Sequence, residues 1–183
     1  TNMVLARSDD RAQMLSDICA LICDKGGYLM AWVGYAQQDA DLSVRPVACA
    51  GVDAELLAGL RVSWGADSPY GQGTTGTAIR LAKTQINRDY ANNQAIAPWR
   101  EFALEHGYQS CIALPFFKKS GARGALMIYS VRADAFSADE VALLEELTGN
   151  LAHELDALED RRRRDEAESA SRAKANSLAN MSH

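Results

Sequence analysis

The stretch SCIALPFFKKSGARGALMIYSVR, residues 110–132, holds two apolar runs separated by the short turn Lys118–Gly121. Two β-rich runs joined by a glycine-containing turn of this length are typical of a β-hairpin. The stretch therefore predicts antiparallel strands at Ser110–Lys118 and Arg123–Arg132. This turn is the strongest hairpin signal in the sequence.

The residues before this hairpin predict more strands. Two β-rich runs, Tyr28–Ala36 and Ser43–Ala50, flank the polar segment Gln37–Asp41 and indicate a second antiparallel hairpin. Shorter runs predict strands at Leu60–Trp64 and Thr84–Arg88. We also expect short helices at residues 53–59 and 97–106, the second after Pro98, because proline suits a first helical turn.

Helical periodicity marks both ends of the chain. Between residues 9 and 25 apolar side chains recur at three- and four-residue spacings, and this helix should end near Gly26. Ser137 followed by Glu140 forms a capping box, with no proline after it. One helix over residues 137–183 would be about 70 Å long at a rise of roughly 1.5 Å per residue, so it should project from the domain.

The first part of this helix has the 3-4 alternation of a coiled-coil seam. Its members are Val141, Leu144, Thr148, Leu151, Leu155 and Leu158. The same frame then meets polar residues, and apolar residues return in a shifted frame at Leu178 and Met181. The break predicts a section where two packings of a dimer have similar energies. We expect a homodimer through the terminal helices; the alternative is an exposed tail that frays.

The composition limits the protein class. The chain has 183 residues, 48% of them hydrophobic and 23% charged, with a net charge of −5. This suffices for one core plus an appendage, but not for two full domains. No apolar run is long enough to cross a bilayer and no targeting signal is readable, so we expect a cytoplasmic protein. The acidic balance argues against nucleic acid as a partner.

Four cysteines are too few for a disulfide framework, and neither they nor the histidines have the spacing of metal ligands. They are Cys19, Cys23, Cys49 and Cys111. We therefore expect no metal site. Cys19 and Cys23 lie one helical turn apart, which leaves a redox pair open, although buried thiols on an apolar face are favoured.

The string GQGTTG, Gly71–Gly76, matches the GxGxxG pattern of dinucleotide-binding folds. A loop precedes it rather than a buried strand, and the surrounding pattern is antiparallel, so we disfavour a dinucleotide site. Thr74 or Thr75 is expected instead to cap a helix starting near Gly76. Free amides at such a helix end could hold an anion or a carboxylate.

Aromatic and charged residues gather in the irregular middle of the chain. Loops over a sheet can supply the apolar walls and few polar anchors that a small-molecule pocket requires. The candidate ligand-binding residues are Trp64, Tyr70, Asp89, Trp99, Arg100 and Tyr108. Their ligand is unknown, and the same side chains could instead plug the loops of a domain that binds nothing.

Several stretches, in order, resemble a bacterial GAF domain of the kind found in sensor kinases and cyclic-dinucleotide enzymes, over most of residues 9–158. They are GGYLMAWVGYA (26–36), VRPVACAG (44–51), GQGTTGTAIR (71–80), APWREFALEHGYQSCIALPF (97–116), GALMIYS (124–130) and FSADEVALLEEL (136–147). The resemblance implies an α+β fold with a central antiparallel sheet of five to six strands, flanking helices, pocket-forming loops and a long C-terminal coiled-coil signalling helix. It implies a sensor domain over residues 1–140 and the signalling helix over residues 137–183.

The segment AKANSLANMSH, residues 173–183, resembles the start of the dimerisation and phosphotransfer helix of histidine kinases. On that resemblance His183 is the phosphoacceptor, and the parent protein autophosphorylates with ATP and Mg²⁺ in a kinase domain outside this sequence. The resemblance also implies that domain and a response-regulator receiver domain as partners. The present chain would not be catalytic alone.

The resemblance does not transfer a ligand. The NKxF…DE signature of cyclic-nucleotide binders is absent, and no cysteine directly precedes a histidine as in bilin binders. Catalytic relatives that reduce methionine sulfoxide need cysteines in their pocket loops, whereas Cys49 and Cys111 fall on expected strands. We therefore expect a sensory module that relays the state of a ligand or an upstream domain through a dimeric helix to His183. The alternatives are a ligand-free dimerisation spacer and a cysteine-based redox sensor, with a catalytic GAF domain least favoured.

Overall fold

The computed structural model describes residues 2–181 and contains a five-stranded sheet with the strand order β2-β1-β5-β4-β3. The strands are β1 (Met30–Ala36), β2 (Val44–Ala50), β3 (Gln85–Asn87), β4 (Ser110–Phe117) and β5 (Arg123–Ser130). Every neighbouring pair is antiparallel. The predicted α+β fold is therefore confirmed, with five strands in the described part of the chain.

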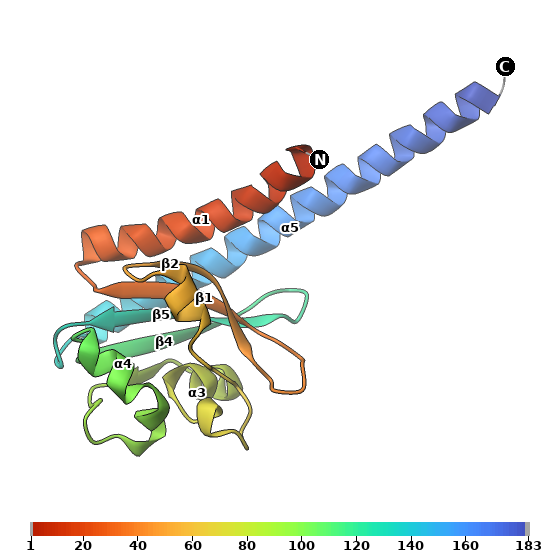
Figure 1. The fold of residues 1–183 in the computed structure, drawn as a ribbon. Coiled ribbons are helices and arrows are strands. Elements are labelled where there is room, and N and C mark those ends of the chain that lie inside the picture. Colours follow the sequence, from red (N-terminus) through yellow and green to blue (C-terminus); the bar gives the residue numbers. More distant parts are fainter. Residues whose placement is uncertain (1, 182–183) are drawn as a thin grey trace.

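Long helices cover one face of the sheet and short helices lie on the other (Figure 1). The long ones are α1 (Asn2–Gly26) and α5 (Ala138–Met181), which lie side by side; α5 continues well past the sheet. The short ones are α2 (Ala54–Ala58), α3 (Thr74–Leu81) and α4 (Arg100–Glu105), with 3-10 turns η1 (Pro69–Gly71) and η2 (Gln94–Trp99). We call this second side the loop layer.

The strands alternate between two buried faces. Ile112, Leu126 and Ile128 point into the core beneath α1 and α5. Their neighbours Cys111 and Met127 point into a second core beneath the loop layer. Because successive side chains of a strand point to opposite faces, one sheet serves as the wall of both cores.

The predicted seam of α5 is packed inside the protein's own core. Leu144, Thr148, Leu151 and Leu155 are at most 6% exposed, and the three leucines pack with strand residues of the sheet. They therefore cannot form the open coiled-coil seam that the sequence pattern suggested. The reason is that one apolar stripe of a helix serves equally well against a sheet or a second helix. From Arg163 to Met181 the described side chains are exposed.

The N-terminus of α5 is fixed to the end of α1. The Ser137 hydroxyl accepts a bond from the Glu140 amide at 3.3 Å, as the capping box predicted. The Tyr28 ring stacks on Phe136 with centroids 5.7 Å apart, and its hydroxyl donates to Glu140 at 2.8 Å. Phe136 adopts a positive φ of 70° although it is buried, so packing of its ring must offset the backbone strain.

One strand expected from the sequence is absent, and one expected helix starts later than predicted. Leu60–Trp64 does not form a strand: it makes a single bridge, Ser63 to Ser43. The Ser63 hydroxyl lies 2.9 Å from the Asp41 carbonyl oxygen and also accepts the Gly65 amide. Such side-chain bonds to the backbone compete with a strand ladder. The helix expected at residues 97–106 is present, but Pro98 lies inside η2 and the α-helical part begins only at residue 100.

We predict that Leu155→Ala lowers the free energy of unfolding by about 2–5 kcal/mol, the usual cost of truncating a fully buried leucine. Leu155 is 0% exposed. Leu81→Ala is the matched control, since that leucine is 56% exposed, and it should change stability by less than about 0.5 kcal/mol. Urea unfolding of both variants measures the difference, and equal losses would contradict the packing described.

Candidate functional site

A small hollow lies between the sheet and the loop layer. Its cavity volume is about 50 Å³. Ligand pockets usually measure about 300 to 1,000 Å³, so in this conformation the hollow is closed to anything larger than water. Its floor is formed by Met30 and Trp32 from β1, Met127 and Tyr129 from β5, and Cys111 from β4.

The polar atoms of the hollow are already paired with one another. The Tyr108 hydroxyl donates to the Met30 sulfur at 3.4 Å, and the Trp32 indole N–H donates to the Tyr129 hydroxyl at 3.1 Å. Burial raises the pKa of Tyr108 to about 12 and that of Tyr129 further above its ordinary value. These phenols therefore stay neutral at physiological pH and act as hydrogen-bonding groups, not as charges.

Trp99 closes the outer side of the hollow. Its indole N–H donates to the Arg61 carbonyl at 2.9 Å. Its ring lies so close to Gly73 that a Cβ added there would be 2.4 Å from a ring carbon. Tyr70 packs edge-on against Trp99 with centroids 6.5 Å apart, and the Arg61 guanidinium lies 4.5 Å from the Tyr70 centroid. Trp99 is thus a lid held by one hydrogen bond and by contacts that are partly exposed.

Two predicted anchors brace a loop instead of facing the hollow. The Arg100 guanidinium donates to the carbonyl oxygens of Tyr90 at 2.8 Å and Asn93 at 3.0 Å. The Asp89 carboxylate accepts the amide of Asn92 at 3.0 Å. These bonds hold the loop that carries Tyr90, whose ring lines the hollow.

Of the six predicted ligand-binding residues, the structure places Trp99 and Tyr108 in the wall of the hollow. Tyr70 packs behind Trp99. Trp64 lies elsewhere, with its indole N–H bonded to the Gln37 carbonyl at 2.8 Å and the Arg123 guanidinium 5.8 Å from its ring. Residues that the sequence analysis missed, Met30, Trp32, Tyr90, Cys111, Met127 and Tyr129, complete much of the wall. The i, i+2 spacing of the strand residues among them was the available signal.

The GQGTTG string serves close packing around α3. The helix starts at Thr74 after Gly73, which makes no side-chain cap bond, so neither threonine caps a helix beginning at Gly76 as expected. A Cβ on Gly76 would lie 2.4 Å from the Ser63 carbonyl oxygen. The glycines thus let backbones approach, and the first turn of α3 lines the hollow.

The four cysteines are free thiols. Burial, with the nearby Cys23 and Cys49 thiols, raises the pKa of Cys19 from 9.0 to about 12, and burial also raises the pKa of Cys23. A thiol reacts as the thiolate, so both are poor nucleophiles at neutral pH. The low reactivity of these thiols disfavours the redox-sensor alternative.

Within residues 2–181, no three His, Cys, Asp or Glu side chains converge as metal ligands.

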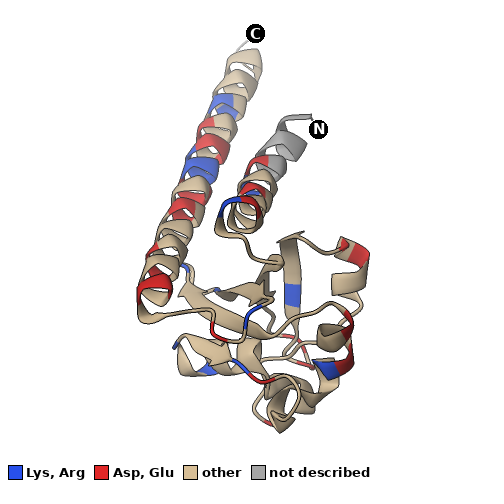
Figure 2. Cartoon of the chain, turned by 90° about the vertical axis from the view of Figure 1, so that its left-hand side faces the viewer, with Lys and Arg blue, Asp and Glu red and all other residues tan. Residues whose placement is uncertain are grey.

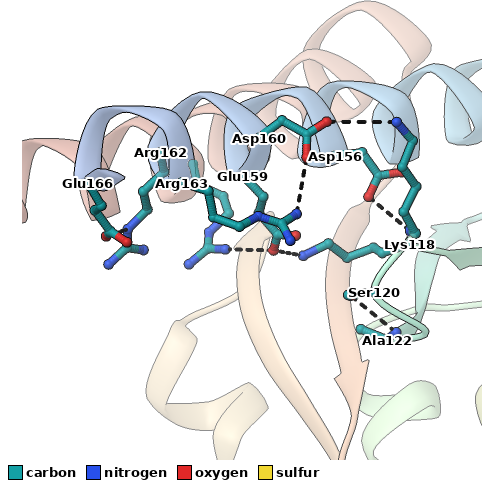
Figure 3. A network of polar contacts seen from close by, with 11 residues as sticks. Lys118, Ser120, Ala122, Asp156, Glu159, Asp160, Arg162, Arg163 and Glu166 are labelled. Atoms are coloured by element: carbon teal, nitrogen blue, oxygen red, sulfur yellow. Dashed lines mark hydrogen bonds and ion pairs between the residues drawn. The ribbon is translucent and has the colours of Figure 1, made fainter. Parts of the chain in front are cut away.

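A network of charges joins the β4–β5 turn to both long helices (Figure 3). The Lys118 ammonium and the Arg11 guanidinium both pair with Glu159 of α5, the latter at 3.2 Å. The Lys118 side chain is only 5% exposed, and its ammonium lies 5.5 Å from the Tyr35 ring centroid. The buried Asp156 carboxylate accepts the backbone amide of Lys119 at 3.1 Å. We call Arg11, Lys118, Asp156 and Glu159 the helix clamp.

Beyond the clamp, α5 carries alternating acidic and basic residues along the segment that leaves the domain (Figure 2). Arg163 pairs with Asp160 at 3.1 Å and Arg162 with Glu166 at 3.1 Å. Such exposed pairs contribute little each, so the polar segment is held mainly by its helical backbone.

His183, the predicted phosphoacceptor, lies outside the described residues. No helix within residues 2–181 has both the length and the hydropathy to cross a membrane.

The fold and the hollow together define a three-layer α+β domain with a small, loop-covered hollow and a projecting helix. A family model described as GAF domain matches residues 8–156, and the chain belongs to that family. No curated protein matches the sequence significantly.

Solved structures of low sequence identity share the fold. The free methionine-R-sulfoxide reductase of Neisseria meningitidis, solved with its substrate, is 19% identical, with a TM-score of 0.67 over 87% of this chain and 86% of that one. The GAF domain of a phosphoenolpyruvate-protein phosphotransferase from Coxiella burnetii is 17% identical, with a TM-score of 0.65 over 84% and 86%. A domain attributed to a two-component sensor histidine kinase protein of Sinorhizobium meliloti is 13% identical, with a TM-score of 0.63 over 84% and 95%.

We predict that stability falls as pH rises above about 9. The folded-state pKa of Cys19 is raised, so its contribution is fully present below the unfolded value of 9.0 and is lost as pH approaches 12. Each such group can contribute a slope of up to about 1.4 kcal/mol per pH unit. Urea unfolding between pH 8 and 11 measures the slope, which Cys19→Ala should make shallower. An unchanged slope in the variant would contradict the assignment.

We predict that Lys118→Met destabilises the chain by about 1–2 kcal/mol, between the values for exposed and buried ion pairs, because Arg11 then remains as the one cation paired with Glu159 among the described side chains. Lys119→Met is the matched control: this side chain is 71% exposed and lies 3.7 Å from Asp160. Its loss should cost less than about 0.5 kcal/mol. Thermal or urea unfolding compares the two neighbours, and a larger loss at Lys119 would refute the clamp.

Proposed function

We propose that this chain is the sensory GAF module of a two-component histidine kinase, which relays the state of its loop layer through α5 to His183. The observation that carries the proposal is the continuity of α5. One uninterrupted helix runs from residues packed on the sheet, such as Leu151, to Met181, two residues before the histidine. A rigid helix transmits a shift or rotation at one end to the other.

The coupling route passes through the sheet. The lid residue Trp99 and the floor residues Met127 and Cys111 line the same hollow. Cys111 lies on β4 and Met127 on β5, and the β4–β5 turn connects these two strands. Lys118 in that turn pairs with Glu159 of α5. A change in the hollow that shifts β4 against β5 would therefore move the clamp and bias the direction in which α5 leaves the domain.

Pairing of two chains would support the exposed helix. A helix in a protein gains most of its stability from packing against other elements, and the α5 side chains from Arg163 to Met181 are exposed. On the outer face of α1 and α5 lies a groove lined by the apolar residues Met14, Ile18, Leu21 and Leu158 and by the polar residues Asp10, Gln13 and Asp17. Leu143 on α5 is also 66% exposed. We propose this face, in place of the buried seam, as the start of a parallel dimer that continues along α5.

In the parent kinase, a ring nitrogen of His183 would attack the γ-phosphorus of ATP, and the bond to the bridging oxygen would break with release of ADP. The phosphohistidine would then pass its phosphoryl group to a receiver aspartate. The ATP-binding domain, with its Mg²⁺, and the response regulator are the proposed partners. The chain contributes control of this step, because the orientation of α5 sets how often the histidine meets the nucleotide. A ligand or an upstream domain shifts that equilibrium only through its differential affinity for the two states, typically about 1–3 kcal/mol.

One observation favours a second function, that of a ligand-free spacer. The hollow of about 50 Å³ is far smaller than an ordinary ligand pocket, and its polar atoms pair with each other. In a spacer the loop layer would be a second core only, and α5 would simply hold two kinase domains at a fixed distance.

We predict that, in the full-length protein, His183→Gln abolishes autophosphorylation and Trp99→Ala changes its rate at least threefold by removing the lid. Leu104→Ala, a truncation of a 54% exposed residue of α4, is the control and should leave the rate unchanged. Phosphate transfer from labelled ATP measures all three. Label persisting in His183→Gln would refute the phosphoacceptor, and a normal rate in Trp99→Ala would favour the spacer.

Light scattering of the same protein should give the mass of a dimer.

A further inference from the structure

The wall of the hollow specifies the charge of what it can hold. Among the described residues that line it, none carries a charged side chain. Its polar groups are hydroxyls, indole N–H groups and one thiol, which can form hydrogen bonds but cannot neutralise an ion. Burying an ion without a counter-charge is far more costly than burying a neutral polar group.

The charged residues nearby are committed to other partners. Arg100 donates to the carbonyl oxygens of Tyr90 and Asn93. Arg80, the basic residue of α3, donates to the carbonyl oxygens of Trp64 and Gly71. The Arg61 guanidinium lies over the Tyr70 ring, 4.5 Å from its centroid. No arginine is among the described residues that line the hollow, so a phosphate ester or a carboxylate there would have no charged partner.

The first turn of α3 supplies the one directional feature of the wall. Gly73 to Gly76 line the hollow, and the leading amides of a helix have no acceptor within the helix. These N–H groups favour a hydrogen-bond acceptor. The end of one short helix carries only about half a positive charge, so it orients a neutral acceptor better than it compensates a full anion.

Trp99 is the part of the wall that can yield. The floor consists of strand residues of the sheet, whereas Trp99 is only partly buried and sits on Gly73 without a covalent or ionic tie. Outward movement of its indole breaks one hydrogen bond, to the Arg61 carbonyl, and adds the volume of the ring to the hollow. The vacated volume is at most that of one indole, so the space holds a single ring comfortably and nothing larger than two fused rings.

We propose that the hollow binds an uncharged, single-ring molecule with one hydrogen-bond acceptor, admitted by outward displacement of Trp99. The inference rests on the proposed sensory function and names the class of its ligand. It excludes phosphate esters and free amino acids, including methionine sulfoxide, whose zwitterion brings two charges to a wall that has none.

Three probes of nearly the same shape test the charge rule: benzamide, which is neutral, benzoate, an anion, and benzamidine, a cation. Each is titrated into the ¹⁵N-labelled 183-residue chain, with L-methionine sulfoxide as the zwitterion. The indole N–H resonance of Trp99, assigned by its loss in Trp99→Phe, reports the lid. We expect benzamide to shift that resonance and to bind at least tenfold more tightly than the three charged probes.

Two outcomes overturn the proposal: a charged probe binding as tightly as benzamide, or no shift of the Trp99 resonance with benzamide at millimolar concentration. Ala103→Leu fills the hollow from α4 and should weaken benzamide at least tenfold. Leu104→Ala, its exposed neighbour, is the matched control and should leave the affinity unchanged. Equal affinities in Ala103→Leu and the control would also overturn the site.

Gly73→Ala provides a second test from the opposite wall, should Ala103→Leu fail to fold. The added methyl group meets the Trp99 ring and pushes the lid outward, so benzamide should bind at least threefold more tightly. An unchanged affinity would overturn the lid route.

The failure of this inference differs from the failure of the proposed function. If benzamide binds but autophosphorylation of the full-length protein is unchanged, the relay to His183 is refuted and the proposed class of ligand is supported. If Trp99→Ala alters autophosphorylation but no uncharged probe binds, the proposed class of ligand is refuted and the relay to His183 is supported.

Discussion

The central sheet is a shared wall, and this constraint organises the rest of the molecule. Ile112 packs beneath the long helices while its neighbour Cys111 packs beneath the loop layer, and β5 repeats the arrangement. Because protein interiors are as densely packed as organic crystals, a displacement on one face cannot be absorbed without a response on the other. The shared sheet therefore couples the hollow on one face to the helix on the other through dense packing alone.

The helix clamp determines where that response leaves the domain. The apolar packing of α5 is complete by Leu155, and the clamp residues Asp156 and Glu159 follow within one turn. Ion pairs that are only partly buried are weak enough to rearrange, unlike a hydrophobic core. A rigid helix attached through such a joint can change direction without unfolding, which is the property that a signalling helix requires.

Much of the fold could be predicted from local patterns, because hairpins and capping boxes depend on residues close in sequence. The two hairpins and the start of α5 at Ala138 are examples. The partner of the α5 stripe could not be predicted, since Leu144 and Leu151 satisfy a sheet or a second helix equally well. At the site, Trp99 and Tyr108 stood out as loop aromatics. The floor and Lys118 were missed because their roles depend on strand register and on a contact across 41 residues.

Hydrogen exchange of the 183-residue chain, compared with Trp99→Ala, tests the relay between lid and helix most directly. If the lid and the helix are coupled, exchange is faster in the variant for the loop layer, for the β4–β5 turn and for the α5 amides from Asp156 onward, where the clamp holds the helix. Faster exchange confined to residues 60–108, with the amides of α5 unchanged, would contradict it. In that case the hollow and the helix would be energetically independent.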